Sequence, residues 1–122
     1  MRLDKFTIKS REALSAAQNL AQQRNHPEIG PVHLLASLIE QSEGILPALL
    51  ERTGIATPRA RSATEQLLAK QPRGSGGDGP GVSSELARVL AAAQKHADSM
   101  KDEYISSEHL LLALVDDKDE AG

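Results

Sequence analysis

The chain has 122 residues, with 14 basic and 17 acidic side chains and a net charge of −3. This length allows one small domain or two very small ones, and it allows a buried core. The charges are mixed along the chain without the basic stripe of a nucleic-acid surface, and no apolar run approaches the roughly 20 residues of a membrane span.

Aromatic residues are scarce and Cys is absent: Phe6 and Tyr104 are the only Phe, Tyr or Trp residues. A core of Leu, Ile, Val and Ala favours packed helices over a sheet, which is richer in β-branched and aromatic residues. The lack of Cys excludes a disulfide framework and suits a reducing compartment. We therefore expect an all-α, cytoplasmic protein that uses neither nucleic acid nor a membrane as partner.

The first half of the chain contains signals for four helices. Thr7 is a good N-cap for a helix that runs to about Arg24, where Pro27 disfavours continuation. Gly30 and Pro31 begin a second helix, since Pro fits the first helical turn. The expected third helix is Ile45–Arg52, ended by a left-handed Gly54. A fourth helix is expected over residues 57–70, with Ala60, Ala63, Leu67 and Leu68 on its buried face.

A stretch rich in Gly and Pro, residues 72–82, separates the two halves and reads as a flexible linker. It lacks the Lys-Ser/Thr ending and the preceding strand of a phosphate-binding loop, so it predicts no nucleotide site. Ser83 or Ser84 caps a fifth helix that ends near Met100. Its expected apolar face consists of Val82, Leu86, Val89, Leu90, Ala93, Ala97 and Met100. Ser106 and Ser107 begin a sixth helix, which is apolar on nearly every side.

The second half repeats the first at a fixed offset of 76 positions. The matched pairs include Ile29 with Ile105, His33 with His109, Leu34 with Leu110, Leu38 with Leu114, Leu14 with Leu90 and Ala17 with Ala93. A fixed-offset repeat indicates a duplicated structural unit. The predicted fold is a duplicated four-helix repeat with pseudo-twofold symmetry, in which residues 1–71 form the first copy and residues 83–122 the first two helices of the second. We expect the chain to be a fragment, because the second copy stops where its third helix begins.

The sequence carries no convincing catalytic or metal-binding pattern. The histidines His26, His33, His96 and His109 lack the spacing of a helical metal pair, and the Gly-x-Ser-x-Gly pattern is absent. We therefore expect a binding module that is not an enzyme and holds neither a metal nor a cofactor. We expect the seam between the two stacked helix pairs to form a hydrophobic groove that binds apolar peptide segments.

Several short motifs resemble one family throughout the chain. They are the opening MRLDKFT, the run from Gly30 to Leu35, the SGGDG of the linker and the run from Asp102 to Glu108. They resemble the N-terminal domain of the ClpB family of bacterial ATP-dependent protein disaggregases, in the Clp/AAA+ class. The resemblance implies a domain that binds unfolded or aggregated polypeptide for a hexameric ring working with the DnaK chaperone system. ATP and Mg²⁺ would belong to ATPase modules outside this chain.

The resemblance also assigns candidate substrate-binding residues. Family positions that handle substrate correspond to Thr7, Asp102 and Glu108, each present as the family type; read without the family, the two acids are a solvated acid and a helix-capping acid. Family groove positions that often carry Leu correspond to Ala92, His96 and His109, which implies a smaller and more polar groove. Further apolar contacts are expected from Leu90, Tyr104 and Leu110.

Two other functions fit parts of the pattern. An adaptor-docking N-domain of a protease-linked Clp unfoldase would have the same fold and bind a folded partner. A helix-turn-helix nucleic-acid module would need a basic recognition helix. The sixth helix is instead Leu-rich and begins with Glu108, which disfavours nucleic-acid binding.

Overall fold

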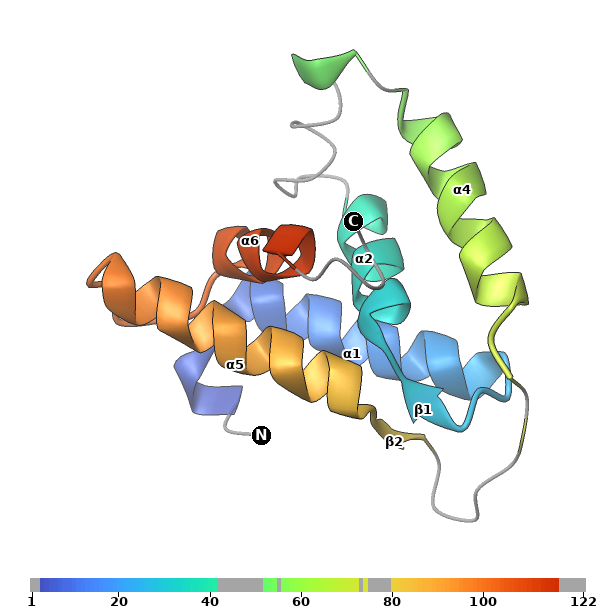
Figure 1. Cartoon of the computed structure of the whole chain (residues 1–122), viewed down its shortest axis with the longest axis horizontal. Coiled ribbons are helices and arrows are strands. Elements are labelled where there is room, and N and C mark those ends of the chain that lie inside the picture. Colours follow the sequence, from blue (N-terminus) through green and yellow to red (C-terminus); the bar gives the residue numbers. More distant parts are fainter. Residues whose placement is uncertain (1–2, 42–51, 55, 73, 75–79, 117–122) are drawn as a thin grey trace.

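A computed structural model describes residues 3–41, 52–54, 56–72, 74 and 80–116 (Figure 1). Its elements in chain order are a 3₁₀ helix η1 (Leu3–Lys5), α1 (Ile8–Gln23), β1 (Glu28–Ile29), α2 (Pro31–Glu40), α4 (Thr57–Ala69), β2 (Gly81–Val82), α5 (Ser84–Ser99) and α6 (Ser107–Asp116). The predicted third helix, Ile45–Arg52, lies outside the described residues except for Arg52. No helix in the described ranges is long and apolar enough to cross a membrane.

The long helix of each repeat begins and ends in the same way. The side chain of Thr7 accepts a hydrogen bond from the amide of Ser10 at 3.3 Å, and the side chain of Ser83 accepts one from the amide of Leu86 at 3.0 Å. Just beyond the two helices, Asn25 and Lys101 both have a left-handed φ of 59°. The same kind of N-cap at the start and the same left-handed conformation after the end confirm that α1 and α5 are equivalent elements.

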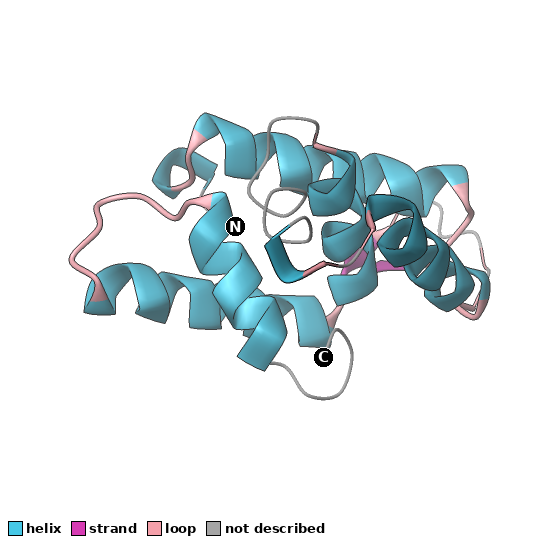
Figure 2. Cartoon of the chain, turned by 90° about the horizontal axis from the view of Figure 1, so that it is seen from above, coloured by secondary structure: helices cyan, strands magenta, loops and turns pink. Residues whose placement is uncertain are grey.

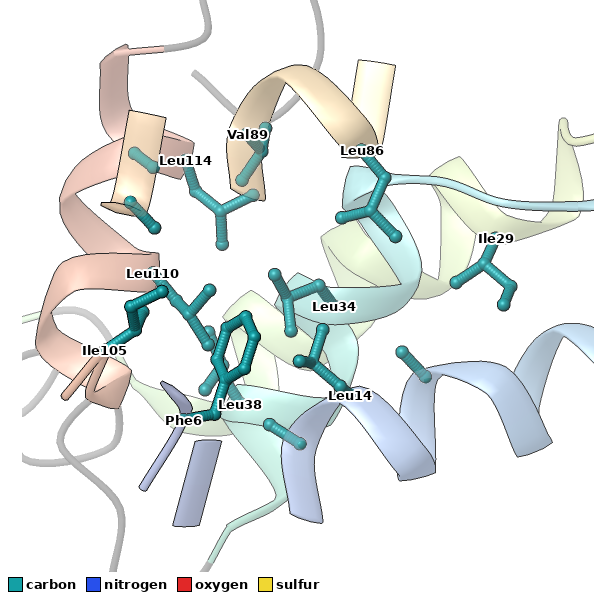
Figure 3. Close-up of a cluster of buried hydrophobic side chains, with 14 of the residues drawn as sticks. Phe6, Leu14, Ile29, Leu34, Leu38, Leu86, Val89, Ile105, Leu110 and Leu114 are labelled. Atoms are coloured by element: carbon teal, nitrogen blue, oxygen red, sulfur yellow. The ribbon is translucent and has the colours of Figure 1, made fainter. Parts of the chain in front are cut away.

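The two repeats share one hydrophobic core, drawn in Figure 3. Within each repeat α1 packs on α2 and α5 packs on α6, while α2 also contacts α5 and α6 across the repeats. The core side chains that point toward one another include Leu14, Leu34, Leu38, Leu86, Val89, Leu110 and Leu114. The matched residues Leu34 and Leu110 are both fully buried, as the duplication predicts.

The repeats are joined by an exchange of short extended segments. β1 pairs in parallel with β2, with Glu28 opposite Gly81, and Phe6 forms an isolated parallel bridge with Ile105. In each case the segment before the second helix of one repeat pairs with the segment that leads into the first helix of the other. The strands are a small patch within an otherwise helical molecule (Figure 2). The last two residues of the predicted linker therefore form a strand.

The predicted buried face of α4 is confirmed at Ala60 and Leu68 and wrong at Ala63 and Leu67. Ala63 and Leu67 are exposed, whereas Thr64 and Leu68 are buried; Ala60 is partly buried as expected. Thr64 can be buried because its hydroxyl donates a hydrogen bond to the carbonyl of Ala60 at 2.8 Å. On this face α4 packs against α2 (Figure 1).

Two residues expected on the apolar face of α5 also lie elsewhere. Val82 and Met100 are 43% and 46% exposed, because they sit just outside the two ends of the helix. The helix itself buries Leu86, Val89 and two alanines, which match the predicted stripe.

Candidate functional site

The exchange between repeats places Thr7 beside the turn that precedes α6. The amide of Thr7 donates to the carbonyl of Ile105 at 3.0 Å, and the amide of Ile105 donates to the carbonyl of Lys5 at 2.8 Å. Asp102 and Glu108 lie three residues before and after Ile105 in the sequence. The structure therefore brings all three predicted substrate-handling residues to one junction, although they come from different repeats.

The carboxylate of Asp102 is held by a buried histidine. His109 Nε2 lies 2.8 Å from Asp102 Oδ2, and His109 Nδ1 accepts from the amide of Ser106 at 2.8 Å. Because Nδ1 is an acceptor, the ring carries its proton on Nε2 and donates it to the carboxylate. Asp102 remains 47% exposed in its side chain, so this fixed carboxylate still faces solvent.

Glu108 is exposed in the first turn of α6. A carboxylate at this position is favoured by the positive end of the helix dipole. The junction thus offers two exposed carboxylates and the hydroxyl of a partly exposed Thr7, all of which accept hydrogen bonds.

The equivalent junction of the first repeat is closed at the three matching positions, and none of them is an acid. Its matching residues are Ser83, His26 and Val32, all of which are at most 4% exposed. His26 Nδ1 lies 2.8 Å from His33 Nε2, so a buried imidazole replaces the exposed carboxylate of Asp102. Burial, followed by the nearby His26, lowers the pKa of His33 to about 4. The positions that match Asp102 and Glu108 therefore carry no acid in the first repeat, where the exposed Glu28 instead matches Tyr104.

An apolar pocket adjoins the candidate junction. It has a volume of about 470 Å³ and is lined by Lys5, Phe6, Val82, Ala87, Leu90, Ala91, Gln94 and Ile105. Phe6 and Ile105 are also the residues whose backbones form the bridge next to Thr7. Tyr104, beside Ile105, is 49% exposed. Leu90 is thus an accessible apolar residue of the pocket, and Tyr104 is one in the turn that carries Asp102.

The other predicted groove residues lie elsewhere. Ala92 and His96 are partly buried and do not line this pocket, since positions 92 and 96 share the opposite flank of α5 from Leu90. His109 is 2% exposed and Leu110 is fully buried, so neither can contact a ligand bound at the surface. The expectation of direct contact is wrong for these two residues: His109 acts on Asp102, and Leu110 belongs to the core.

A second, larger pocket of about 610 Å³ lies between α1, α2 and α4. Two ion pairs occur among its lining residues, Arg24 with Glu65 and Arg61 with Glu40, each at 2.5 Å. None of the predicted site residues lines it. Within the ranges that the structure describes, no group of three His, Cys, Asp or Glu side chains is arranged to hold a metal ion.

Sequence reasoning did not single out Ser10, whose hydroxyl lies between Thr7 and Ile105. The repeat offered a signal, because Ser10 is polar where its matched residue, Leu86, is a core leucine. Phe6 and Ile105 were likewise expected only as ordinary residues of the chain, yet both line the pocket.

Comparison with known proteins gives consistent matches. The Clp repeat N-terminal domain family matches residues 5–122. The chaperone protein ClpB of Nitratidesulfovibrio vulgaris is 41% identical over 121 residues, which cover 96% of this chain and 14% of the relative. ClpB of Rhodopirellula baltica is 37% identical over 114 residues, covering 93% of this chain and 13% of that protein. The chain thus spans about a seventh of the length of these relatives.

Solved structures with the same fold include two N-terminal domains. That of the ClpV1 ATPase from E. coli EAEC Sci1 T6SS has a TM-score of 0.84 and 34% identity, covering 92% of this chain and 68% of that one. The Hsp104 N-terminal domain from Candida albicans has a TM-score of 0.83 and 28% identity, and the match covers 93% of this chain and 75% of that one. Together with the duplicated helices and the exchanged junction, these matches show that the chain belongs to the Clp repeat N-terminal domain family.

Proposed function

We propose that this chain is the substrate-binding N-terminal domain of an ATP-dependent protein disaggregase and that it binds unfolded or aggregated polypeptide. The observation that carries the proposal is the junction between the repeats, where Thr7 is hydrogen-bonded to Ile105 between Asp102 and Glu108. Exposed acceptors beside an apolar pocket suit a polypeptide whose backbone amides and apolar side chains are both unpaired. The 41% identity to part of the chaperone protein ClpB of Nitratidesulfovibrio vulgaris supports the proposal.

The remaining parts of the activity belong to a longer protein in this proposal. ATP and Mg²⁺ bind in ATPase modules of that protein, which assembles as a cytoplasmic hexamer and works with the DnaK chaperone system. The domain supplies the first contact with the polypeptide. Its affinity is weak, because a shallow site buries little area while association costs translational and rotational entropy.

The test compares an unfolded protein with its own folded form. Reduced, carboxymethylated α-lactalbumin is labelled and titrated with the domain by fluorescence anisotropy, and native α-lactalbumin is titrated in parallel. We expect binding of the unfolded form only. Asp102→Asn with Glu108→Gln should weaken it, whereas Glu12→Gln, which removes a charge from the larger pocket, should not. Equal binding of both forms, or no effect of the double variant, would refute the proposal.

A second candidate function is the docking of one dedicated partner protein, as expected for an adaptor-docking N-domain. It is supported by the likeness to the N-terminal domain of the ClpV1 ATPase. The same titration separates the two functions. A docking domain would bind neither form of α-lactalbumin, and it would retain one stoichiometric partner from its own cell after a salt wash.

A further inference from the structure

Ser10 is a buried polar residue at a position that the other repeat fills with a core leucine. It is fully buried, and its matched residue Leu86 is 1% exposed. Burying a hydroxyl costs free energy unless it is hydrogen-bonded, so a leucine or alanine would serve packing alone at lower cost. Its contacts indicate what the hydroxyl adds.

The Ser10 hydroxyl lies among three oxygen atoms. Ser10 Oγ is 2.8 Å from the carbonyl oxygen of Ile105, 3.0 Å from the carbonyl oxygen of Thr7 and 2.9 Å from Thr7 Oγ1. Neither carbonyl carries a hydrogen, so at these distances only the Ser10 proton can be shared with them. Ser10 therefore donates to the carbonyls, and the remaining contact forms only if the Thr7 hydroxyl donates to Ser10.

This arrangement fixes the direction of the Thr7 hydroxyl. Its proton points inward to Ser10, and one of its lone pairs accepts from the Ser10 amide at 3.3 Å. The lone pair that remains is an acceptor. In the other repeat, Ser83 caps α5 in the same way but faces Leu86, which has no hydroxyl to take its proton.

We propose that Ser10 is a positioning residue that makes Thr7 an acceptor toward ligands, so that the junction selects groups that donate N–H hydrogen bonds. The inference rests on the proposed function and deepens it. Thr7, Asp102 and Glu108 then present acceptors alone. The matching ligand is an unpaired backbone amide of a polypeptide or the cationic end of a Lys or Arg side chain.

The test is a double-mutant cycle between Ser10→Ala and Thr7→Val, with binding of reduced, carboxymethylated α-lactalbumin as the readout. Ser10→Ala should weaken binding about threefold to tenfold, the size of one net hydrogen bond. In the Thr7→Val background the same change should have no further effect. Ser83→Ala is the matched control, because it removes the equivalent cap at the closed junction; it should lower stability and leave the effect of Ser10→Ala on affinity unchanged.

Thr7→Ser provides a second comparison, since it keeps the hydroxyl. It should bind as the unmodified protein does and remain sensitive to Ser10→Ala. Repeating the titration at high salt separates the ligand groups: affinity that survives indicates backbone amides, and affinity that is lost indicates cationic side chains. Both outcomes agree with an acceptor site.

Three results would count against the inference. Equal weakening by Ser10→Ala in both backgrounds would show that Ser10 acts on the fold and not through Thr7. No weakening at all would show that the hydroxyl direction is irrelevant to binding. If the unmodified domain does not bind the unfolded probe, the proposed function itself fails, and the inference falls with it.

Discussion

At the scale of single residues, His33 makes stability depend on pH. Its imidazole is fully buried against His26, and its pKa is lowered from 6.5 to about 4. Between these values the unfolded chain binds a proton that the folded chain excludes, so stability falls as the pH is lowered. We expect a loss of up to about 3 kcal/mol in the free energy of unfolding.

Urea unfolding at neutral pH and near pH 4 measures this loss. His33→Gln removes the titrating group and should flatten the acid dependence, although it lowers stability at neutral pH by breaking the contact with His26. If the variant lost as much free energy of unfolding between neutral pH and pH 4, the pH dependence would belong to other groups.

Two neighbouring leucines of α2 give a matched test of burial. Leu34 is fully buried, while Leu35 packs against the core from a partly exposed position. Leu34→Ala should therefore cost about 2–5 kcal/mol of stability, and Leu35→Ala clearly less. Chemical denaturation of both variants checks the order, and equal costs would contradict the described packing.

The sequence predicted core residues better than polar ones. Leu34 and Leu110 were placed correctly because both copies of the repeat carry an apolar residue there. His109 was not, since a histidine suits a surface as well as a buried position where both ring nitrogens are bonded. Only the structure shows that Ser106 and Asp102 occupy those nitrogens.

At the scale of elements, the left-handed residues that follow α1 and α5 differ in their conformational free-energy cost. Asn25 and Lys101 share a left-handed φ of 59°, which Asn tolerates and Lys does not. Lys101→Gly should raise the free energy of unfolding by about 0.5–1 kcal/mol, and Asn25→Gly by less. Thermal unfolding of the two variants tests this order; a larger gain at Asn25 would contradict it.

Helix positions could be predicted because caps and prolines mark them in the sequence, as at Thr7 and Pro31. The face of α4 could not, because a Thr that bonds to its own helix backbone is buried where an alanine was expected. The strands β1 and β2 have two residues each, which is too short for any alternation to appear.

At the scale of the whole molecule, the shared core predicts a single unfolding transition. Leu14 and Leu34 from one repeat pack in the same cluster as Leu86 and Leu110 from the other (Figure 3). The only tyrosine, Tyr104, reports on the second repeat, whereas circular dichroism reports on all helices. The two signals should follow the same curve in urea. Separate midpoints would mean that the repeats are independent units.

The duplication was visible in the sequence as a fixed offset, but the exchange between repeats was not. The bridge of Phe6 with Ile105 and the pairing of β1 with β2 depend on contacts between distant segments. The family resemblance named Thr7, Asp102 and Glu108, and the exchange explains why residues so far apart in the chain meet.

The central claim is that unfolded polypeptide binds at this junction, and chemical-shift mapping tests it most directly. The isotope-labelled domain is titrated with reduced, carboxymethylated α-lactalbumin, and the amide signals are followed residue by residue. Shifts concentrated at Thr7, Asp102 and Glu108 and along the pocket around Leu90 are the predicted result. Shifts confined to the pocket between α1, α2 and α4, or at the closed junction near His26, would contradict the account.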